Sequence, residues 1–229
     1  MGWSYESPAG PDRWGDLDAS FAACKLGRAQ SPVNIVDAQA ATFAGRLHFH
    51  YREFQARLEH NGHTLTAQDD NGGFVEIDGE CYQLKQFHFH VSAEHRIDGQ
   101  PFAMEIHLVH ESASGGTAVI GVLARQGAAS TVLEPLWQKL PRKQGGVGPS
   151  VSFHPARLLP ATRTFYHYTG SLTTPPCTEG VRWFVFADPI TVSTAQLNAF
   201  TAIIPHNNRP VQPLHGRKTW RGGSTLPRR

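Results

Sequence analysis

The stretch that decides how this chain folds is Gln86-Phe87-His88-Phe89-His90. Successive side chains of a β-strand point to opposite faces, so His88 and His90 share one face with Gln86. Phe87 and Phe89 then lie on the other face. We expect this second face to be buried, which makes the segment one strand of a sheet that packs on an apolar core.

A third histidine, His107, follows 17 residues later in Glu105-Ile106-His107. The interval allows the chain to turn and return as a neighbouring strand, with Glu105 and His107 on one face. Three imidazoles on adjoining strands predict a zinc site with an open fourth position, which is a catalytic arrangement because structural zinc normally has four protein ligands. Gln86 and Glu105 each precede a histidine by two residues and could fix its tautomer by accepting the other ring N–H.

Histidines in strands can also serve packing alone, so the spacing leaves that alternative open. A second pair, His48 and His50, occurs in Leu47–Tyr51 and provides a comparison. This segment alternates between apolar and polar residues. We interpret its two histidines as solvent-facing side chains.

Size and charge narrow the class of protein. The chain has 229 residues, enough for one substantial core, and 40% of them are apolar. No stretch approaches the ~20 apolar residues of a membrane helix. A net charge of +2 argues against a nucleic-acid partner or a membrane surface. The first residues lack the features of a secretory signal, so the protein is expected to be cytosolic or to begin at its mature end.

The three cysteines are Cys24, Cys81 and Cys177, and an odd number leaves at least one thiol unpaired. Cys81 leads into the strand with His88 and is expected to be a small buried core residue. Cys24 and Cys177 lie in loop-like segments and could pair, although counting alone leaves three pairings open.

Alternating and apolar runs separated by turn signals predict a mainly β protein. We expect strands over residues 47–51, 74–77, 82–91, 102–110, 117–123, 162–168 and 181–186. Helices are expected over residues 131–140, capped by Ser130, and 193–203, where Ser193 and Gln196 stand in capping-box positions. The sequence therefore predicts a single domain over residues 1–229, with an irregular arm over about 1–36 and a few helices outside the sheet.

The most specific local motif beyond the histidines is Ser171-Leu172-Thr173-Thr174-Pro175-Pro176. Paired prolines fix φ and stiffen the loop, so the two threonine hydroxyls could orient a small polar species. Taken alone, the motif is more typical of an ordinary turn.

Together these motifs closely resemble the alpha-class carbonic anhydrases, most of all the exported bacterial members. The matching segments run from end to end of the chain: Trp3-x-Tyr5, Gly10-Pro11-x-x-Trp14, residues 30–35, 61–64, 86–90, 92–95, 105–110 and 171–177, and Asn207-x-Arg209-Pro210-x-Gln212-Pro213-Leu214. The resemblance implies a large, mostly antiparallel, twisted central sheet with the zinc site in a conical cavity. It also implies one Zn²⁺ per chain.

The resemblance implies a role for each matching residue. His88, His90 and His107 would bind zinc, with Gln86 and Glu105 behind His88 and His107. Thr173 would accept a hydrogen bond from zinc-bound hydroxide and donate to Glu94, and Thr174 would hold bicarbonate or a water. The carbon dioxide pocket would be formed by Val109, Val119, Leu172, Val181 and Trp183. His63 would shuttle protons, and Tyr5, Asn61 and Thr66 would order the water between it and the metal.

The implied activity is reversible hydration of carbon dioxide to bicarbonate and a proton by a zinc lyase. Hydrolysis of activated esters would be a side activity, and sulfonamides and anions would inhibit at zinc. Two features depart from many animal members, namely Val91 after the histidine pair and Thr66. Domains of this family that only bind partners have replaced one or more of the histidines, so the intact set favours the enzyme.

Cys24 and Cys177 match the cysteine pair of the exported members. The resemblance therefore implies a disulfide between them and an oxidising compartment, periplasmic or extracellular. Exported members are often dimers, which leaves a homodimer open.

Overall fold

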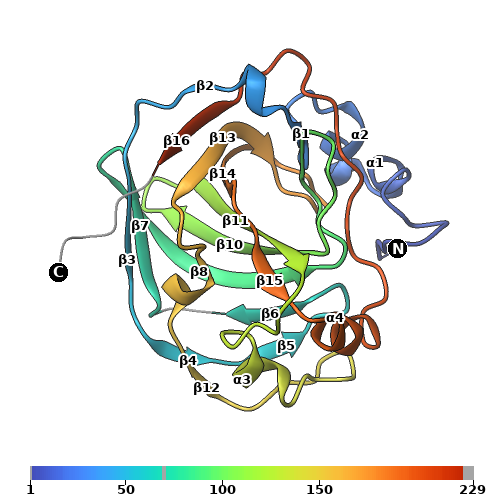
Figure 1. The fold of residues 1–229 in the computed structure, drawn as a ribbon. Coiled ribbons are helices and arrows are strands. Elements are labelled where there is room, and N and C mark those ends of the chain that lie inside the picture. Colours follow the sequence, from blue (N-terminus) through green and yellow to red (C-terminus); the bar gives the residue numbers. More distant parts are fainter. Residues whose placement is uncertain (1, 69–70, 224–229) are drawn as a thin grey trace.

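The computed structural model describes residues 2–68 and 71–223, and the description below covers these residues. A large twisted sheet runs through the molecule (Figure 1). Its strands are β2 Ala41–Thr42, β3 Leu47–Tyr51, β5 Leu58–His60, β6 Leu65–Gln68, β7 Gly73–Ile77, β8 Glu80–His90, β10 Met104–Ser112, β11 Thr117–Gln126, β13 Thr164–Ser171, β14 Glu179–Phe186, β15 Ile190–Val192 and β16 Trp220–Gly223.

The order of strands across the sheet is β2-β16-β13-β14-β11-β10-β8-β6-β5. Off this path, β7 pairs with β8, β3 pairs with β7, and β15 pairs with β11. Antiparallel pairing predominates, as the resemblance implied. Parallel pairing occurs where β11 meets β14 and β15, and where β16 meets β2. Two small sheets pair β1 Asn34–Ile35 with β9 Arg96–Ile97, and β4 Phe54–Ala56 with β12 Val151–Phe153.

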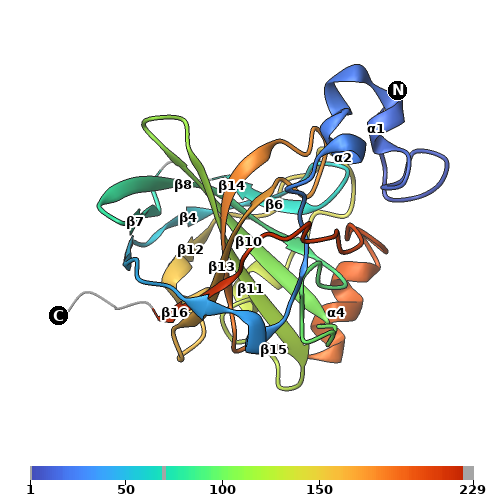
Figure 2. The same cartoon turned by 90° about the horizontal axis from the view of Figure 1, so that it is seen from above.

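The helices are short and peripheral, which confirms a mainly β fold (Figures 1 and 2). They are α1 Trp14–Leu17, α2 Ala23–Leu26, α3 Glu134–Trp137 and α4 Thr194–Thr201, with single 3₁₀ turns η1 Ala19–Phe21, η2 Asp37–Gln39 and η3 Pro155–Leu158. The N-terminal arm carries α1, η1 and α2. Figure 2 shows α1 and α2 at one corner of the molecule, beside the chain's beginning.

The two expected helices have different outcomes. At α4 the capping box of Ser193 and Gln196 is present in both directions. The expected helix over residues 131–140 is wrong in length, because α3 covers only four residues with turns on either side. A segment this short depends on tertiary contacts. Trp137 supplies one of them by donating from Nε1 to the Gln196 carbonyl at 2.9 Å.

Alternation along β8 divides its side chains between two environments. Phe87 and Phe89 are fully buried in the larger apolar core, as predicted. His88 and His90 face the other side of the sheet, where a second apolar cluster gathers around Trp183. Both faces of the central strands are therefore covered, and the second face holds the histidines.

The cysteines give one confirmation and one correction. Cys24 and Cys177 form the implied disulfide, with an S–S distance of 2.06 Å. Cys81 was expected in the core, but its thiol is free and exposed. The reason is the register of β8: Tyr82 and Leu84 face the core, so Cys81 must point outwards.

Within the described residues, no helix is both long and apolar enough to cross a membrane.

Candidate metal centre and active site

The three predicted histidines converge on one point. β8 and β10 are antiparallel neighbours, and His107 lies directly opposite His88 in their register. His90 follows two residues after His88 on the same face. One ring nitrogen from each of the three lies within 4.8 Å of the others. The sheet itself therefore positions the donors.

Hydrogen bonds fix which nitrogen faces the centre. His88 Nδ1 donates to Gln86 Oε1 at 2.7 Å, and His90 Nδ1 donates to the Asn207 carbonyl at 2.6 Å. Both rings are thus left with an unprotonated Nε2. The Nε2 of His90 is buried without a hydrogen-bond partner among the described residues, as expected for a nitrogen whose partner is an ion.

His107 presents its other nitrogen. Its Nε2 donates to Glu105 Oε1 at 2.8 Å, so Nδ1 carries the lone pair that points at His88 and His90. Burial lowers the pKa of all three histidines, to about 4 for His90. Neutral imidazoles are the form that binds a metal ion.

Glu105 is a buried carboxylate that accepts several hydrogen bonds in addition to the one from His107. Its Oε1 also accepts from His95 Nδ1 at 2.7 Å, and its Oε2 accepts the backbone N–H groups of Glu94 and His95. Burial raises the pKa of Glu105, but His95 and His107 outweigh it and hold the pKa well below its usual range. His95, Glu105 and His107 also cluster closely, but the atoms facing one another are already joined by hydrogen bonds.

The donor set fits zinc. Three neutral imidazoles match the ligands of a catalytic zinc with one open position, and a carboxylate and an amide orient two of them from behind. The buried Nε2 of His90 makes no hydrogen bond within the described residues, which leaves it available to bind the ion. His88, His90 and His107 would therefore hold the ion.

Glu94 and Thr173 lie next to the triad. Glu94 Oε1 accepts the Arg209 backbone N–H at 2.8 Å, while its Oε2 is buried without a hydrogen-bond partner among the described residues. Oε2 lies 3.9 Å from His107 Nδ1. Burial raises the pKa of Glu94 to about 7, and the nearby Thr173 hydroxyl acts in the opposite direction.

A cavity of about 300 Å³ opens beside His88 and His107. One wall is apolar, because Val109 on β10 pairs with Val119 on β11, which in turn pairs with Trp183 on β14. Leu172, Thr173 and Thr174 also line this cavity. Val181 is buried in the same apolar cluster but does not line this cavity.

A second, adjoining cavity of about 120 Å³ also reaches His88 and His90. It contains the residues expected to carry protons and order water: Tyr5, Asn61, His63 and Thr66. Asn61 donates to Thr66 Oγ1 at 3.2 Å and accepts the His63 backbone N–H at 2.9 Å. The His63 ring stacks on Trp3 with centroids 3.6 Å apart.

Comparison with known proteins agrees with this site. The family model of eukaryotic-type carbonic anhydrases matches residues 9–222. The chain belongs to this family. Its activity is the hydration of carbon dioxide, and its metal site is the histidine triad. Among bacterial relatives, the carbonic anhydrase of Klebsiella pneumoniae is 42% identical over 94% of this chain and 89% of its own, and that of Neisseria gonorrhoeae is 40% identical over 94% and 86%.

Solved structures show the same alpha-class carbonic anhydrase fold. The enzyme from Thermovibrio ammonificans, in complex with the inhibitor sulfanilamide, superposes with a TM-score of 0.90 at 38% identity, covering 96% of this chain and 98% of that one. Dioscorin in complex with ascorbate has a TM-score of 0.91 at 32% identity, with coverage of 98% and 99%.

The sequence analysis assigned no role to three residues that shape this carbonic anhydrase site. Asn207 and His95 stand within matched motifs, but nothing in their spacing shows that one orients His90 and the other holds Glu105. Gly121 lies opposite His107, where an added Cβ would come within 3.2 Å of Glu105 Oε1. Only the pairing of β10 with β11 shows that a side chain at Gly121 would crowd the Glu105 carboxylate.

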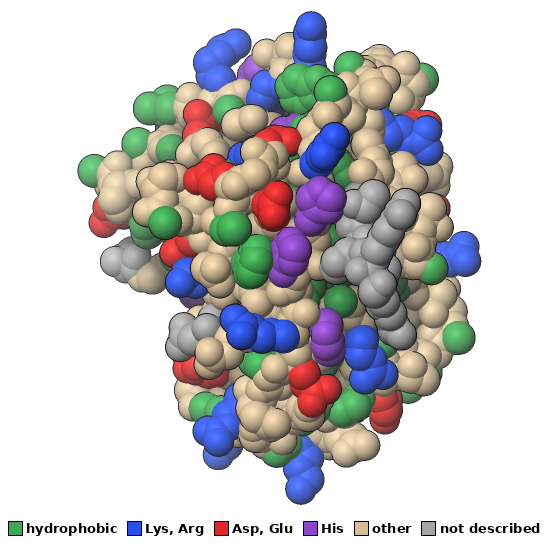
Figure 3. Space-filling view, turned by 90° about the vertical axis from the view of Figure 1, so that its left-hand side faces the viewer, with side chains coloured by type: hydrophobic (Ala, Val, Ile, Leu, Met, Phe, Trp, Pro, Cys, Tyr) green, Lys and Arg blue, Asp and Glu red, His purple; other side chains and the backbone are tan. Residues whose placement is uncertain are grey.

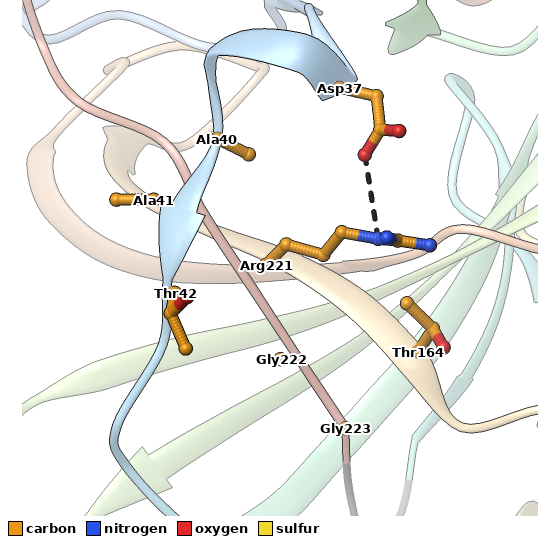
Figure 4. Close-up of a pocket in the computed structure, with 8 residues that line it drawn as sticks. All are labelled: Asp37, Ala40, Ala41, Thr42, Thr164, Arg221, Gly222 and Gly223. Atoms are coloured by element: carbon orange, nitrogen blue, oxygen red, sulfur yellow. Dashed lines mark ion pairs between the residues drawn. The ribbon is translucent and has the colours of Figure 1, made fainter.

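Other hollows of this carbonic anhydrase are separate from the metal centre. One of about 450 Å³ lies between β2 and β16, where Arg221 Nε is 3.4 Å from Asp37 Oδ1 (Figure 4). It shares no lining residue with the triad and contains no histidine. Its single cation is already paired with a carboxylate.

Proposed function

We propose that this carbonic anhydrase hydrates carbon dioxide in the 300 Å³ cavity, with substrate against the apolar wall and the triad beneath it. The observation that carries the proposal is the convergence of three unprotonated ring nitrogens beside that wall. Carbon dioxide is small and apolar, so Val109, Val119 and Trp183 offer it a favourable surface next to the reacting centre.

His88, His90 and His107 would hold the zinc ion, which would supply a bound water that ionises near neutral pH, with a pKa of about 7 as in carbonic anhydrases generally. The chain's own contribution is to fix the three donors in one tautomer each. Gln86, Asn207 and Glu105 do so by accepting the ring N–H groups on the far sides of the histidines.

Thr173 and Glu94 orient the reacting oxygen. Glu94 Oε2 has an unused lone pair in a buried position, and the Thr173 hydroxyl can donate to it. A hydroxyl that donates to Glu94 can only accept from the reacting oxygen, so it aims the lone pair of that oxygen at the substrate. Thr174, in the same cavity, would hold the product or a displaced water.

His63 would carry the proton away. It lies with Tyr5, Asn61 and Thr66 in the adjoining cavity, so water there can connect it to the metal centre. Burial beside Trp3 lowers its pKa below the ordinary value, with a smaller contribution from His60. The neutral ring is therefore available to accept a proton at neutral pH.

The same open position supports two further properties. Activated esters present an acyl carbon to the same nucleophile, so we expect weak esterase activity. Relatives crystallised with sulfanilamide and acetazolamide suggest that sulfonamides, and small anions, bind here as well.

A binding module is the alternative from another class. The similarity to dioscorin, which has been solved in complex with ascorbate, is the reason to consider a binding function. The intact triad argues against it, because a purely binding domain needs neither three converging imidazoles nor a buried carboxylate beside them.

The Cys24–Cys177 disulfide favours an oxidising compartment, so we infer a periplasmic or extracellular protein. The continuous main sheet supports a single domain over residues 1–229. A homodimer stays a prediction.

Stopped-flow measurement of carbon dioxide hydration, with parallel elemental analysis, tests the function. We expect one zinc per chain, loss of activity when a chelator removes it, and recovery on adding zinc back. Full activity in metal-free protein would refute the proposal, and so would stoichiometric zinc without hydration.

A further inference from the structure

The histidines of this chain occupy two kinds of environment. His48 and His50 of β3 are only partly covered, as expected from their alternating segment. Figure 3 shows histidine side chains at the surface on one side of the molecule. His95, in contrast, is completely buried, just before β9. A buried imidazole needs a partner for each ring nitrogen, and the partners of His95 connect the metal centre to a distant part of the chain.

Both ring nitrogens of His95 make hydrogen bonds. Nδ1 lies 2.7 Å from Glu105 Oε1, the oxygen that also accepts from His107. Nε2 lies 2.6 Å from the hydroxyl of Tyr168 on β13. This hydroxyl lies 2.8 Å from Ser31 Oγ, and both side chains are fully buried. A continuous network of buried hydrogen bonds therefore joins a metal ligand to Ser31.

The direction of these bonds follows from a backbone donor. Among the described residues, Ser31 Oγ has two partners, the Tyr168 hydroxyl and the Ser171 N–H at 3.0 Å, which can only donate. The Ser31 proton is therefore directed to the Tyr168 oxygen, and the Tyr168 proton to Nε2 of His95. Burial raises the pKa of the Tyr168 phenol well above its ordinary value, so the phenol retains this proton. His95 is left with its proton on Nδ1, where it donates to Glu105.

Ser31 is also bonded to the loop that carries Thr173. Its backbone N–H donates to Ser171 Oγ at 2.9 Å, so the two serines bond in both directions. The Ser171 carbonyl accepts Nε1–H of Trp183, a residue of the apolar cavity wall, at 2.9 Å. Gly170 permits this close approach, because an added Cβ there would collide with Ser31 Oγ. The serine pair therefore fixes the start of the loop against the cavity wall.

Arg209 provides a second connection from Ser31 to the active site. Its guanidinium donates from Nη1 to the Ser31 carbonyl at 2.8 Å, and its backbone N–H donates to Glu94 Oε1 at 2.8 Å. The Arg209 side chain is buried, so both bonds are shielded from water. Glu94 and Glu105, the two buried carboxylates of the site, are thus both tied to Ser31.

We propose that Ser31 and Tyr168 are positioning residues that hold the metal ligand His107 and the loop of Thr173 in a fixed relative arrangement. The inference rests on the proposed zinc site and deepens it. Neither residue lines a cavity of the active site, so both act through the network. Hydrogen bonds that run in one direction through a buried network polarise one another, so removing its far end weakens the bonds next to the ligand.

Tyr168→Phe tests the part of the network that reaches the metal. The variant keeps the ring and removes the donor to His95 Nε2. We expect zinc affinity, measured by competition with a chromophoric chelator, to fall about 3- to 10-fold, less than for a direct partner of a ligand. Tyr166→Phe is the matched control, because Tyr166 is buried on the same strand and its hydroxyl donates to Asp37 Oδ1 at 2.7 Å, outside the network. Equal zinc affinities in the two variants would overturn the proposal.

Ser31→Ala tests whether the far end of the network acts through Tyr168. This variant should also weaken zinc binding. The double variant Ser31→Ala/Tyr168→Phe should bind zinc like Tyr168→Phe alone, because residues that act in series are not additive. Additive losses of affinity would overturn the proposal.

Nitrogen-15 NMR of His95 in the zinc-loaded protein provides a readout that does not depend on activity. The wild type and Tyr166→Phe should show a protonated Nδ1 and an unprotonated Nε2. The Nε2 signal should shift in Tyr168→Phe. A protonated Nε2 in the wild type would reverse the network and overturn the proposal. Failure of the proposed function would appear instead as missing zinc or hydration in the wild type.

Discussion

Glu105 Oε1 lies 2.8 Å from Nε2 of His107, and this contact determines which nitrogen of His107 faces the metal centre. His88 and His90 are held through Nδ1, whereas His107 is held through Nε2. The triad therefore combines two Nε2 donors with one Nδ1 donor. The carboxylate that creates this difference is buried and carries its charge because His95 and His107 surround it.

Replacing Glu105 with Gln should weaken zinc binding by about 10- to 100-fold. The amide oxygen can still accept one N–H, but the amide nitrogen is a donor and opposes the backbone N–H groups of Glu94 and His95. Competition with a chromophoric chelator measures the affinity. Glu111→Gln, an exposed position on the same strand, is the control and should bind zinc normally. Equal affinity in both variants would show that Glu105 does not position the ligand.

His63→Ala should reduce kcat by about 10- to 100-fold in weak buffer and leave kcat/KM nearly unchanged. The substitution removes the proton carrier without touching the carbon dioxide pocket. Stopped-flow assays at several buffer concentrations provide the measurement, and added imidazole should restore part of the rate. His215→Asn, which removes an exposed histidine that lines neither cavity of the active site, is the control and should keep the wild-type rate. If the hydration rate of His63→Ala does not depend on buffer concentration, another group carries the proton.

His167 should make the fold sensitive to acid. Burial lowers its pKa to about 4, whereas an unfolded histidine titrates near 6.5. The unfolded state therefore takes up the proton first, and stability present above about pH 6.5 is lost as the pH falls towards 4. The full loss is about 3 kcal/mol.

The test is the free energy of unfolding as a function of pH for the wild type and His167→Phe. Phe removes the titrating group and keeps an aromatic ring against Phe184, on which His167 stacks. The stability difference between the two proteins should change by up to about 3 kcal/mol in favour of Phe between pH 7 and 4. Parallel pH curves would contradict the assignment.

Breaking the disulfide should destabilise the fold and loosen the active-site loop. The link spans 153 residues, so the loop-entropy model gives an upper figure of about 5 kcal/mol. Cys177 N–H donates to the Thr174 carbonyl at 2.8 Å, which connects the bond to the loop that carries Thr173. Chemical denaturation of Cys24→Ser/Cys177→Ser, together with its hydration rate, provides the measurement.

Cys81→Ser is the matched control for the disulfide variant, since it removes a free, exposed thiol. It should change stability by no more than about 0.5 kcal/mol. If the double Ser variant were as stable as this control, the disulfide would contribute nothing to the fold.

Periodicity predicted the parts of this structure that depend on neighbours in sequence. The alternation over residues 86–90 gave the buried and metal-facing sides of β8, and the capping pattern at Ser193 gave the start of α4. The same alternation, extended to the start of β8, would have placed Cys81 on the buried side with Phe87. A register shift between Leu84 and Gln86 reverses the two faces and leaves Cys81 outside the core. The helix at α3 was predicted too long, because its apolar residues are buried through contacts with α4 rather than through helical length.

What the sequence could not provide depends on residues far apart in the chain. The Asn207 carbonyl reaches His90 across 117 positions, and a backbone acceptor leaves no trace in residue type. The parallel pairing of β11 with β14 likewise follows from topology, since a continuous apolar run is compatible with either direction. Family resemblance supplied the disulfide pairing, which counting cysteines left open.

Anomalous diffraction at the zinc absorption edge tests the central claim most directly. The account predicts one strong peak about 2.0–2.1 Å from Nε2 of His88, Nε2 of His90 and Nδ1 of His107, with a solvent molecule as the fourth ligand. A peak elsewhere with the triad empty, or a fourth protein side chain closing the coordination sphere, would contradict it.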